Sequence, residues 1–317
     1  MFLSNLNVPA YAASLPPMTE SYDDPIPCRD PFILLAGDVY HLYKRIVTDG
    51  ENAYIACQRS LDLKTWTAPE AVFVPPADFH GVKDMFWAPE CHYYKGKYYI
   101  FTSVFSKTYN HRCISVYRAD NPMGPFEDIA NGCVTVPEWD TIDGTLYVDE
   151  AGDPWLVFVH EWTCMPDHNG SMVAARLSED LTHLISEPVT LFFAKDAPWA
   201  TEGVTDGPYL YRKENGHLLM IWSNFTGGSF HDYCIGIAHS ETGKIEGPWV
   251  QEEKLLYQQS TEGGLPYDGG HGMLFRDKEG CLMLSLHTPN GKRKYGIFEH
   301  VCLLPVKEEG DTLVIAR

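Results

Sequence analysis

The chain repeats one short pattern five times, and this repeat limits its possible folds more than any other feature. Each copy begins with two apolar segments separated by a glycine-containing turn, as in DGPYLYRKENGHLLMIWS. The five copies occupy residues 30–45, 89–103, 143–162, 206–223 and 271–288. Glycine suits the turn of a β-hairpin, and the Tyr, Leu, Ile, Val and Phe of the second segments favour strands.

A third strand-like segment follows each pair, for example NAYIACQRS at 52–60, and a weaker fourth follows in some copies, as at 71–74 and 189–193. The copies start about 60 residues apart, and none shows a long helical period. Four antiparallel strands in each of five repeats predict an all-β fold, a five-bladed β-propeller. Separate sandwich domains explain the repeat less well, because one copy is too short to bury a core alone.

The pattern predicts one propeller domain over residues 27–317, preceded by an N-terminal extension at 1–26. Residues 1–18 contain neither a basic segment nor a sustained apolar one, so we expect no signal peptide and no membrane span. A cytoplasmic location is the default expectation, although a removed leader would leave no trace. The nine cysteines lie mostly in apolar segments without close pairing, and we expect buried, reduced thiols.

The net charge of -19 argues against nucleic acid or an anionic membrane as a partner, because both require a basic surface. It leaves a neutral ligand, such as a sugar, as a possible substrate. The chain is 44% hydrophobic and its charged residues are dispersed, which is typical of a large folded core.

In a propeller the innermost strand comes first in each blade, so the starts of the five repeats converge on one face of the ring. These starts carry Asp30, Glu90, Asp143, Asp206 and His271. The far ends of the second strands reach the same face and add Arg45, Phe105, residues 160–162, residues 224–225 and His287. The sequence therefore predicts a pocket of carboxylates and a histidine with an aromatic rim.

A single aspartate at such a position is commonly a turn cap. Three aspartates at matching repeat positions instead indicate a catalytic cluster, because buried like charges are costly and raise each other's pKa values. Paired carboxylates suit glycoside hydrolysis, in which one activates water and one protonates the leaving oxygen. Sugar-stacking faces are expected from Trp87, Trp162 and Phe225, with packing between blades as the alternative role.

Four motifs carry a resemblance to a known family. They are CRDPF at 28–32, FWAPE at 86–90, IDGTLYVDEAGDPWLVF at 142–158 and TDGPYLYRKENGHLLMIWS at 205–223. In their order and spacing the chain resembles glycoside hydrolase family 43, from about residue 27 to its end. The resemblance implies a five-bladed propeller with the activity of a β-xylosidase, an α-L-arabinofuranosidase or an arabinanase. It also implies hydrolysis with inversion of the anomeric configuration.

The resemblance assigns roles to individual residues. Asp30 matches the general base, and Asp143 matches the acid that tunes the pKa and orients the third carboxylate. Asp206 stands where the family usually has a glutamate as general acid, and its side chain is one methylene shorter. Glu202, in the loop before the fourth repeat, is an alternative acid, and Glu161 is a third candidate on the same face.

His271 resembles the histidine that many members of the family place on the propeller axis near a bound calcium ion. Calcium among carboxylates and waters would reduce their mutual repulsion. The alternative is a histidine whose partners are the neighbouring acids, without a metal. Arg293 is expected near Asp143, where its charge would keep that carboxylate ionised.

Three other functions remain open at this stage. In the first alternative, the propeller binds glycans but has lost hydrolysis because Asp206 replaces the usual glutamate. A β-fructosidase-like enzyme shares RDP and EC motifs, but the NDPNG-like segment that such enzymes need upstream is absent. A phosphorylase would need a cationic phosphate pocket, for which the candidates are Arg45, Lys292, Arg293 and Lys294. The favoured substrate is a pentose-containing fragment of a plant polysaccharide.

Overall fold

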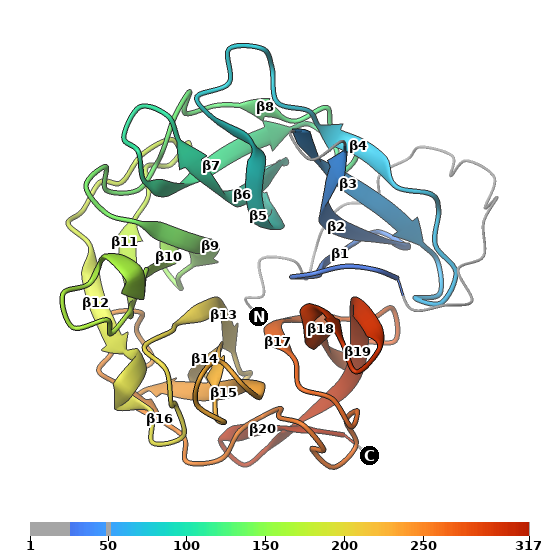
Figure 1. Ribbon diagram of the computed structural model, residues 1–317, viewed down its shortest axis with the longest axis vertical. Helices are drawn as coiled ribbons and strands as arrows, with labels where there is room; N and C mark the ends of the chain where they lie inside the picture. The colour runs from blue at the N-terminus through green and yellow to red at the C-terminus, as the bar shows by residue number, and fades with distance from the viewer. Residues whose placement is uncertain (1–25, 49–51, 317) are drawn as a thin grey trace.

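The computed structural model describes residues 26–48 and 52–316, which form five four-stranded antiparallel sheets around a central axis (Figure 1). In every sheet the strands follow each other in chain order from the axis to the rim. This arrangement confirms the predicted five-bladed β-propeller. Helical structure among the described residues is limited to two short 3-10 turns, η1 (Trp162–Cys164) and η2 (Ala194–Asp196). In this part of the chain no helix has the length and apolar character needed to cross a membrane.

Blade one contains β1 (Phe32–Ala36), β2 (Val39–Thr48), β3 (Asn52–Ser60) and β4 (Glu70–Phe73). Blade two contains β5 (Gly81–Tyr94), β6 (Lys97–Ser106), β7 (Arg112–Ala119) and β8 (Glu127–Asp128). Blade three contains β9 (Thr141–Val148), β10 (Pro154–His160), β11 (Ser171–Arg176) and β12 (Val189–Phe193). Blade four contains β13 (Asp206–Arg212), β14 (Leu218–Phe225), β15 (Tyr233–Ser240) and β16 (Trp249–Gln251). Blade five contains β17 (Gly270–Arg276), β18 (Leu282–Lys294), β19 (Ile297–Glu309) and β20 (Thr312–Ile315).

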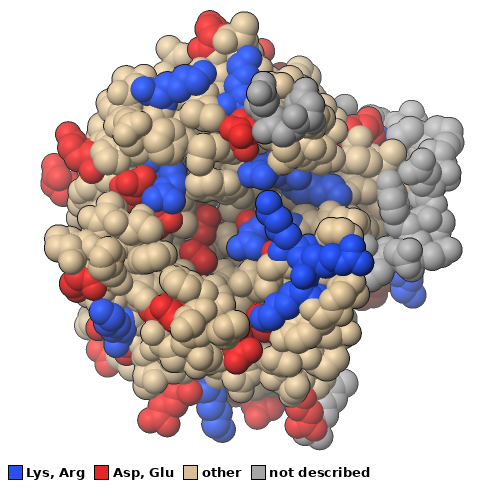
Figure 2. Space-filling view, in the orientation of Figure 1, with Lys and Arg blue, Asp and Glu red and all other residues tan. Residues whose placement is uncertain are grey.

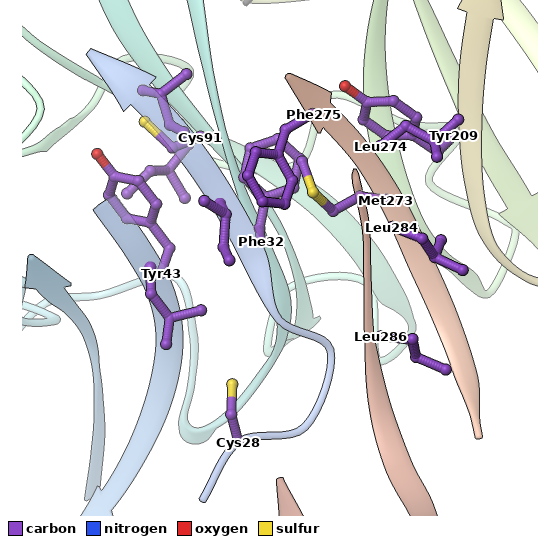
Figure 3. Packing of buried hydrophobic residues seen from close by; sticks show 14 of the residues in the cluster. Cys28, Phe32, Tyr43, Cys91, Tyr209, Met273, Leu274, Phe275, Leu284 and Leu286 are labelled. Carbon is purple, nitrogen blue, oxygen red and sulfur yellow. The ribbon is translucent and has the colours of Figure 1, made fainter. Parts of the chain in front are cut away.

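The core lies between the faces of neighbouring blades. Both faces of a blade are covered by other blades, so the inner strands are apolar along most of their length rather than alternating. Phe32 of β1 and Met273 of β17 belong to a large apolar cluster that also includes Cys91 and Tyr209 (Figure 3). This cluster therefore joins blades one, two, four and five, and two smaller clusters join blade three to its neighbours.

The start of the described chain closes the ring against blade five. The backbone N–H of Val301 in β19 donates to the carbonyl of Ile26 at 3.0 Å, and the N–H of Cys28 donates to the carbonyl of Glu299 at 3.2 Å. Lys44 donates from Nζ to the carbonyl of Pro27 at 3.0 Å. These bonds hold the residues just before Asp30 at the axis. Of the predicted extension at 1–26, all but Ile26 lies outside the described residues.

Blade five differs from the sequence prediction in its length. We expected its second strand to end near residue 288, but β18 and β19 are each 13 residues long and form an extended hairpin that turns at Tyr295 and Gly296. Arg293 lies one residue before the end of β18 and pairs in register with Phe298. The Gly-Lys-Arg-Lys segment therefore continues a strand rather than ending it.

The cysteine prediction is wrong for two residues. Cys113 of β7 and Cys133 form a disulfide, with their Cα atoms 5.6 Å apart. Their separation of 20 residues gave no sign of pairing, because it is the fold of β7 against the following loop that brings them together. The other seven cysteines are free thiols, and only Cys164 and Cys281 among them are exposed.

Candidate active site

Each inner hairpin starts with a residue in the left-handed backbone region. The five residues are Asp30, Ala88, Asp143, Gly207 and His271, with φ between 45° and 52°. Each stands two residues before the same regular cross-strand pair, namely Phe32–Tyr43, Glu90–Phe101, Thr145–Val157, Tyr209–Ile221 and Met273–Ser285. In blades two to five the pairing of the first two strands is irregular at this position, and a bulge of this kind redirects side chains at a strand end.

This register corrects the sequence alignment at two positions. Asp206 was aligned with Asp30 and Asp143, but the residue equivalent to them is Gly207. Glu90 was also treated as a repeat start, although it lies two residues after the equivalent position, Ala88. Glu90 is buried and contacts Nε2 of His92 at 2.9 Å, and it does not line the pocket described below.

Gly207 explains why the fourth repeat is shifted. A Cβ atom at this position would lie 2.9 Å from Cγ of His271, and the φ of 51° is unfavourable for most side chains. Aspartate is tolerated in this conformation at the first and third repeats, but here the ring of His271 leaves no room. The carboxylate is supplied by the preceding residue, Asp206.

We expect Gly207→Ala to destabilise the protein by about 1–3 kcal/mol, because it adds both a steric overlap and an unfavourable φ. Denaturant unfolding of the variant and the wild type measures this difference. Gly216→Ala is the matched control: Gly216 also has a positive φ, of 86°, but a Cβ there would meet nothing within 4 Å. A loss no greater than that of Gly216→Ala would contradict the packing role of His271.

The pocket at this end of the axis has a volume of about 740 Å³. Its lining includes five carboxylates, together with His271: Asp30, Asp143, Glu161, Asp206 and Glu299. The aromatic part of the lining is formed by Phe86, Trp87, Trp162, Phe225 and Phe230. The cationic part is formed by Arg29, Arg45, Arg112 and Lys292. Figure 2 shows acidic side chains inside the central hollow and basic ones around one side of it.

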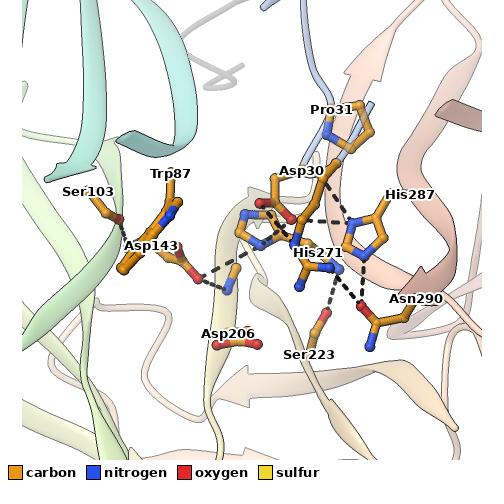
Figure 4. Close-up of polar contacts among 12 residues, drawn as sticks. Asp30, Pro31, Trp87, Ser103, Asp143, Asp206, Ser223, His271, His287 and Asn290 are labelled. Carbon is orange, nitrogen blue, oxygen red and sulfur yellow. Dashed lines mark hydrogen bonds and ion pairs between the residues drawn. The ribbon is translucent and has the colours of Figure 1, made fainter. Parts of the chain in front are cut away.

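Asp30 is held as a carboxylate. Its Oδ1 lies 3.2 Å from Nδ1 of His271, and its Oδ2 lies 3.7 Å from Nε of Arg29 (Figure 4). Burial alone would raise the pKa of Asp30, but the charges of His271 and Arg29 outweigh burial and hold this pKa well below its usual range. The backbone N–H of Asp30 donates to Nδ1 of His287 at 3.3 Å, which fixes the residue against blade five.

Asp143 links blades two, three and four. Its backbone N–H donates to the Ser103 hydroxyl at 2.8 Å, and its Oδ2 accepts a hydrogen bond from the N–H of Gly207 at 3.1 Å (Figure 4). Oδ2 also lies 3.7 Å from Nδ1 of His271. Burial raises the pKa of Asp143, although the charge of His271 opposes the shift. The Gly207 bond places Asp143 directly beside Asp206.

Asp206 can hold a proton near neutral pH. Burial and the neighbouring charge of Asp143 raise its pKa to about 7, and His271 and a hydrogen bond from Tyr233 only partly oppose that rise. The bond runs from the hydroxyl of Tyr233 to Oδ2 at 3.0 Å. The pocket therefore combines an ionised carboxyl group, that of Asp30, with a protonatable one, that of Asp206. Such a pair supplies a base and an acid at the same pH.

His271 faces the acids rather than a metal-ligand cluster. Burial alone would lower its pKa, but Asp30, Asp143 and Asp206 outweigh burial and raise it. Within the described residues, no group of three or more His, Cys, Asp or Glu side chains has an arrangement that would hold a metal ion. The ion-pair contacts of His271 in this part of the chain are therefore with acids, and a calcium ion near it stays a prediction.

Four of the remaining predicted site residues line the pocket, and Glu202 does not. Trp87, Trp162 and Phe225 line the pocket, as does Glu161, which forms an ion pair with Arg112. Glu202 does not line it, and its Oε1 accepts a hydrogen bond from the N–H of Phe230 at 3.2 Å.

The expectation that Arg293 lies against Asp143 is wrong. Arg293 is exposed at the end of β18, and its guanidinium lies 4.8 Å from the ring centre of Phe298. The extension of β18 beyond the blade carries it away from the axis. The cation beside the acids is instead Arg29.

Sequence reasoning missed several functional side chains. Arg29 is adjacent to Asp30 in the sequence, so its proximity was a usable signal. Tyr233 lies in the third strand of blade four, and nothing in the sequence indicates that its hydroxyl reaches Asp206. Arg112 comes from the third strand of blade two and lies 5.9 Å from the ring centre of Trp87. Phe230 follows a turn and lies 5.6 Å from Trp162.

Comparison with known proteins gives one consistent result. The model of the family described as "Glycosyl hydrolases family 43" matches residues 22–312. The solved endo-arabinase of Bacteroides thetaiotaomicron has a TM-score of 0.79 and 37% identity, over 92% of this chain and 99% of that one. The extracellular endo-α-(1→5)-L-arabinanase 1 of Bacillus subtilis is 23% identical over 77% of this chain and 73% of its own. The exo-α-(1→5)-L-arabinofuranosidase ArbA of Cellvibrio japonicus is 23% identical over 71% of this chain and 66% of its own.

Proposed function

Because the chain belongs to glycosyl hydrolases family 43, and is therefore an enzyme that hydrolyses glycosidic bonds, we propose that it hydrolyses the pentosidic linkages of plant polysaccharide fragments with inversion of the anomeric configuration. The supporting observation is that one pocket holds Asp30, whose pKa is lowered, and Asp206, whose pKa is raised to about 7. The favoured pentose is L-arabinose, because the relatives named above act on arabinan linkages. A β-xyloside is the second candidate.

In the proposed reaction Asp30 removes a proton from the attacking water. Asp206 donates a proton to the leaving oxygen, and Asp143 keeps that proton on Asp206 through its nearby charge. Trp87 and Trp162 provide flat apolar faces for the sugar rings. Asp30 becomes protonated and Asp206 ionised in the same step, so exchange of protons with solvent restores the starting state.

The test is a hydrolysis screen of the purified protein against aryl α-L-arabinofuranoside, aryl β-xyloside and aryl β-galactoside. We expect turnover of a pentoside and none of the hexoside. Hydrolysis of the galactoside alone would overturn the pentose assignment. Running each assay with and without a chelator tests the calcium expectation separately.

We expect kcat/KM for the preferred pentoside to fall as the pH rises through about 7, because Asp206 acts in its protonated form. The hydroxyl of Tyr233 donates to Oδ2 of Asp206 and so favours the anion. Tyr233→Phe removes this bond, raises the pKa of Asp206, and moves the alkaline limb to higher pH. Measurement of kcat/KM against pH for both proteins checks this shift. A limb that stays in place or moves to lower pH would contradict the role of Tyr233.

A second function has one specific observation in its favour: the acid position holds an aspartate. A propeller of this kind would bind oligosaccharides without hydrolysing them. Asp206→Glu distinguishes the two functions. If the aspartate side chain is too short to reach the leaving oxygen, the longer glutamate would raise the hydrolytic activity. Loss of activity in this variant would indicate that the pocket is built around aspartate.

A further inference from the structure

Positive charge is concentrated at one side of the pocket in an otherwise acidic protein. Three cations, Arg29, Arg45 and Lys292, line the pocket there, although the chain as a whole carries a net charge of -19. Figure 2 shows basic side chains along one border of the central hollow. A hydrolase of neutral pentosides needs no such group, because its substrate carries no charge for these residues to neutralise.

Two of these cations have no acidic partner within residues 26–48 and 52–316. Arg29 is neutralised by Glu299, at 2.6 Å, and by Asp30. Arg45 donates only to the carbonyl of Phe86, at 3.1 Å, and neither Arg45 nor Lys292 forms an ion pair in that part of the chain. Both are exposed at the pocket.

Burial of its guanidinium lowers the pKa of Arg45, and the charges of Asp84 and Asp30 oppose this shift without forming an ion pair with it. Arg45 is therefore a cation that would gain from an anionic partner. Neighbouring Lys294, in contrast, has its own partner, because its Nζ donates to Asp268 at 2.6 Å. Of the three cations Arg45, Lys292 and Lys294, the two that line the pocket are thus the two without an ion pair among the described residues.

The cationic side of the pocket continues into a second hollow of about 300 Å³, whose lining shares Arg29, Lys292 and Glu299 with the pocket. The charge of Glu299 is paired with that of Arg29, so Lys292 is the cation of this hollow without an ion pair among the described residues. Phe298 of the long β18–β19 hairpin also lines this hollow and is 57% exposed. Arg293 lies over the ring of Phe298. An exposed aromatic ring beside cations provides a stacking face for one more sugar unit and donors for its charged group.

We propose that Arg45 and Lys292 bind the carboxylate of a uronic acid residue in the glycan, so that the substrate is a pentose attached to an acidic sugar chain. This inference deepens the proposed function and rests on it. The oxyanion could in principle come from inorganic phosphate acting as co-substrate. The ionised Asp30 disfavours that source, because its negative charge would repel a phosphate that took the place of the water in the proposed reaction.

The experiment compares binding of two matched ligands by isothermal titration calorimetry. One is a pentose oligosaccharide with a uronic acid unit, and the other is the same oligosaccharide with its carboxyl group reduced to the alcohol. The full-length Asp30→Asn protein is used so that neither ligand is consumed. We expect the acidic ligand to bind on the order of tenfold more tightly, with a preference that decreases as salt is added.

Arg45→Gln and Lys292→Gln, each in the same background, are expected to reduce this preference at least about threefold, as the loss of one ion pair would. Lys254→Gln is the matched control: it removes the same charge from an exposed lysine of blade four that does not line the pocket. Thermal unfolding of each variant establishes that the fold is retained. Equal affinity for the two ligands, or a preference that survives both substitutions together, would overturn the proposal.

A second arm distinguishes the two sources of the oxyanion. Inorganic phosphate is added to the wild-type protein with an aryl pentoside, and we expect no acceleration and release of free pentose only. Formation of pentose 1-phosphate would assign the cations to phosphate and overturn the uronate proposal. Pentoside hydrolysis without any preference for the acidic ligand refutes this inference alone, whereas a preference without hydrolysis supports it and refutes the proposed activity.

Discussion

Asp30→Asn is expected to lower kcat for the preferred pentoside by about 100- to 10,000-fold, the range usual for loss of a general base. The amide is nearly the same size as the carboxylate but cannot accept the proton of the attacking water. KM should change much less, because Asp30 is proposed to act on water rather than on the sugar. Steady-state kinetics of the variant and the wild type measure both quantities.

Asp38→Asn is the matched control for this variant. Asp38 lies in the exposed turn at the other end of the β1–β2 hairpin, so the same chemical change is made in the same blade but outside the pocket. We expect wild-type kcat for Asp38→Asn, and circular dichroism should report a folded propeller for both variants. Activity of Asp30→Asn above a tenth of the wild type would remove Asp30 from the role of base.

Asp206→Asn is expected to have an effect that depends on the leaving group. For oligosaccharides, whose leaving oxygen must be protonated, kcat/KM should fall by about 100- to 10,000-fold. For an aryl pentoside with an activated, acidic phenol the loss should be much smaller, because that oxygen leaves without a proton. The alkaline limb near pH 7 should disappear with the activated substrate. Kinetics of one variant on the two substrates measure this difference.

Glu202→Gln is the control for the acid assignment, because Glu202 is the alternative acid and lies outside the pocket lining. We expect it to retain most activity on both substrates. If Glu202→Gln showed the dependence on leaving group and Asp206→Asn did not, Glu202 would be the acid. The loop that carries it would then have to move to bring its carboxyl group into the pocket.

The fold could be predicted from the sequence because its signal is repeated. One hairpin with a glycine turn is weak evidence, but five copies at similar spacing allow few architectures other than a propeller. The repeat also predicted that Asp30, Asp143 and His271 meet at the axis, since all three occupy the same position of their blades. What the repeat could not give was the exact register of the fourth blade.

That register depends on packing rather than on pattern. Gly207 occupies the left-handed position because the ring of His271 lies against it, and a sequence alignment guided by acidic residues matches Asp206 instead. The length of β18 was not predicted either, because the repeat ended this strand at residue 288, whereas the strand continues through the polar segment GKRK. Arg293 was misplaced for this reason. The contact of Tyr233 with Asp206 joins residues 27 apart and is determined by tertiary structure alone.

The stereochemistry of hydrolysis tests the central claim most directly, namely that Asp30 activates water while Asp206 protonates the leaving group. Proton NMR during the first minutes of hydrolysis of the preferred aryl pentoside identifies the anomer released before mutarotation. Direct attack of a water activated by Asp30 predicts a first product of inverted configuration. A first product that retains the configuration of the substrate would mean that a carboxylate attacks the sugar itself, and would contradict the account.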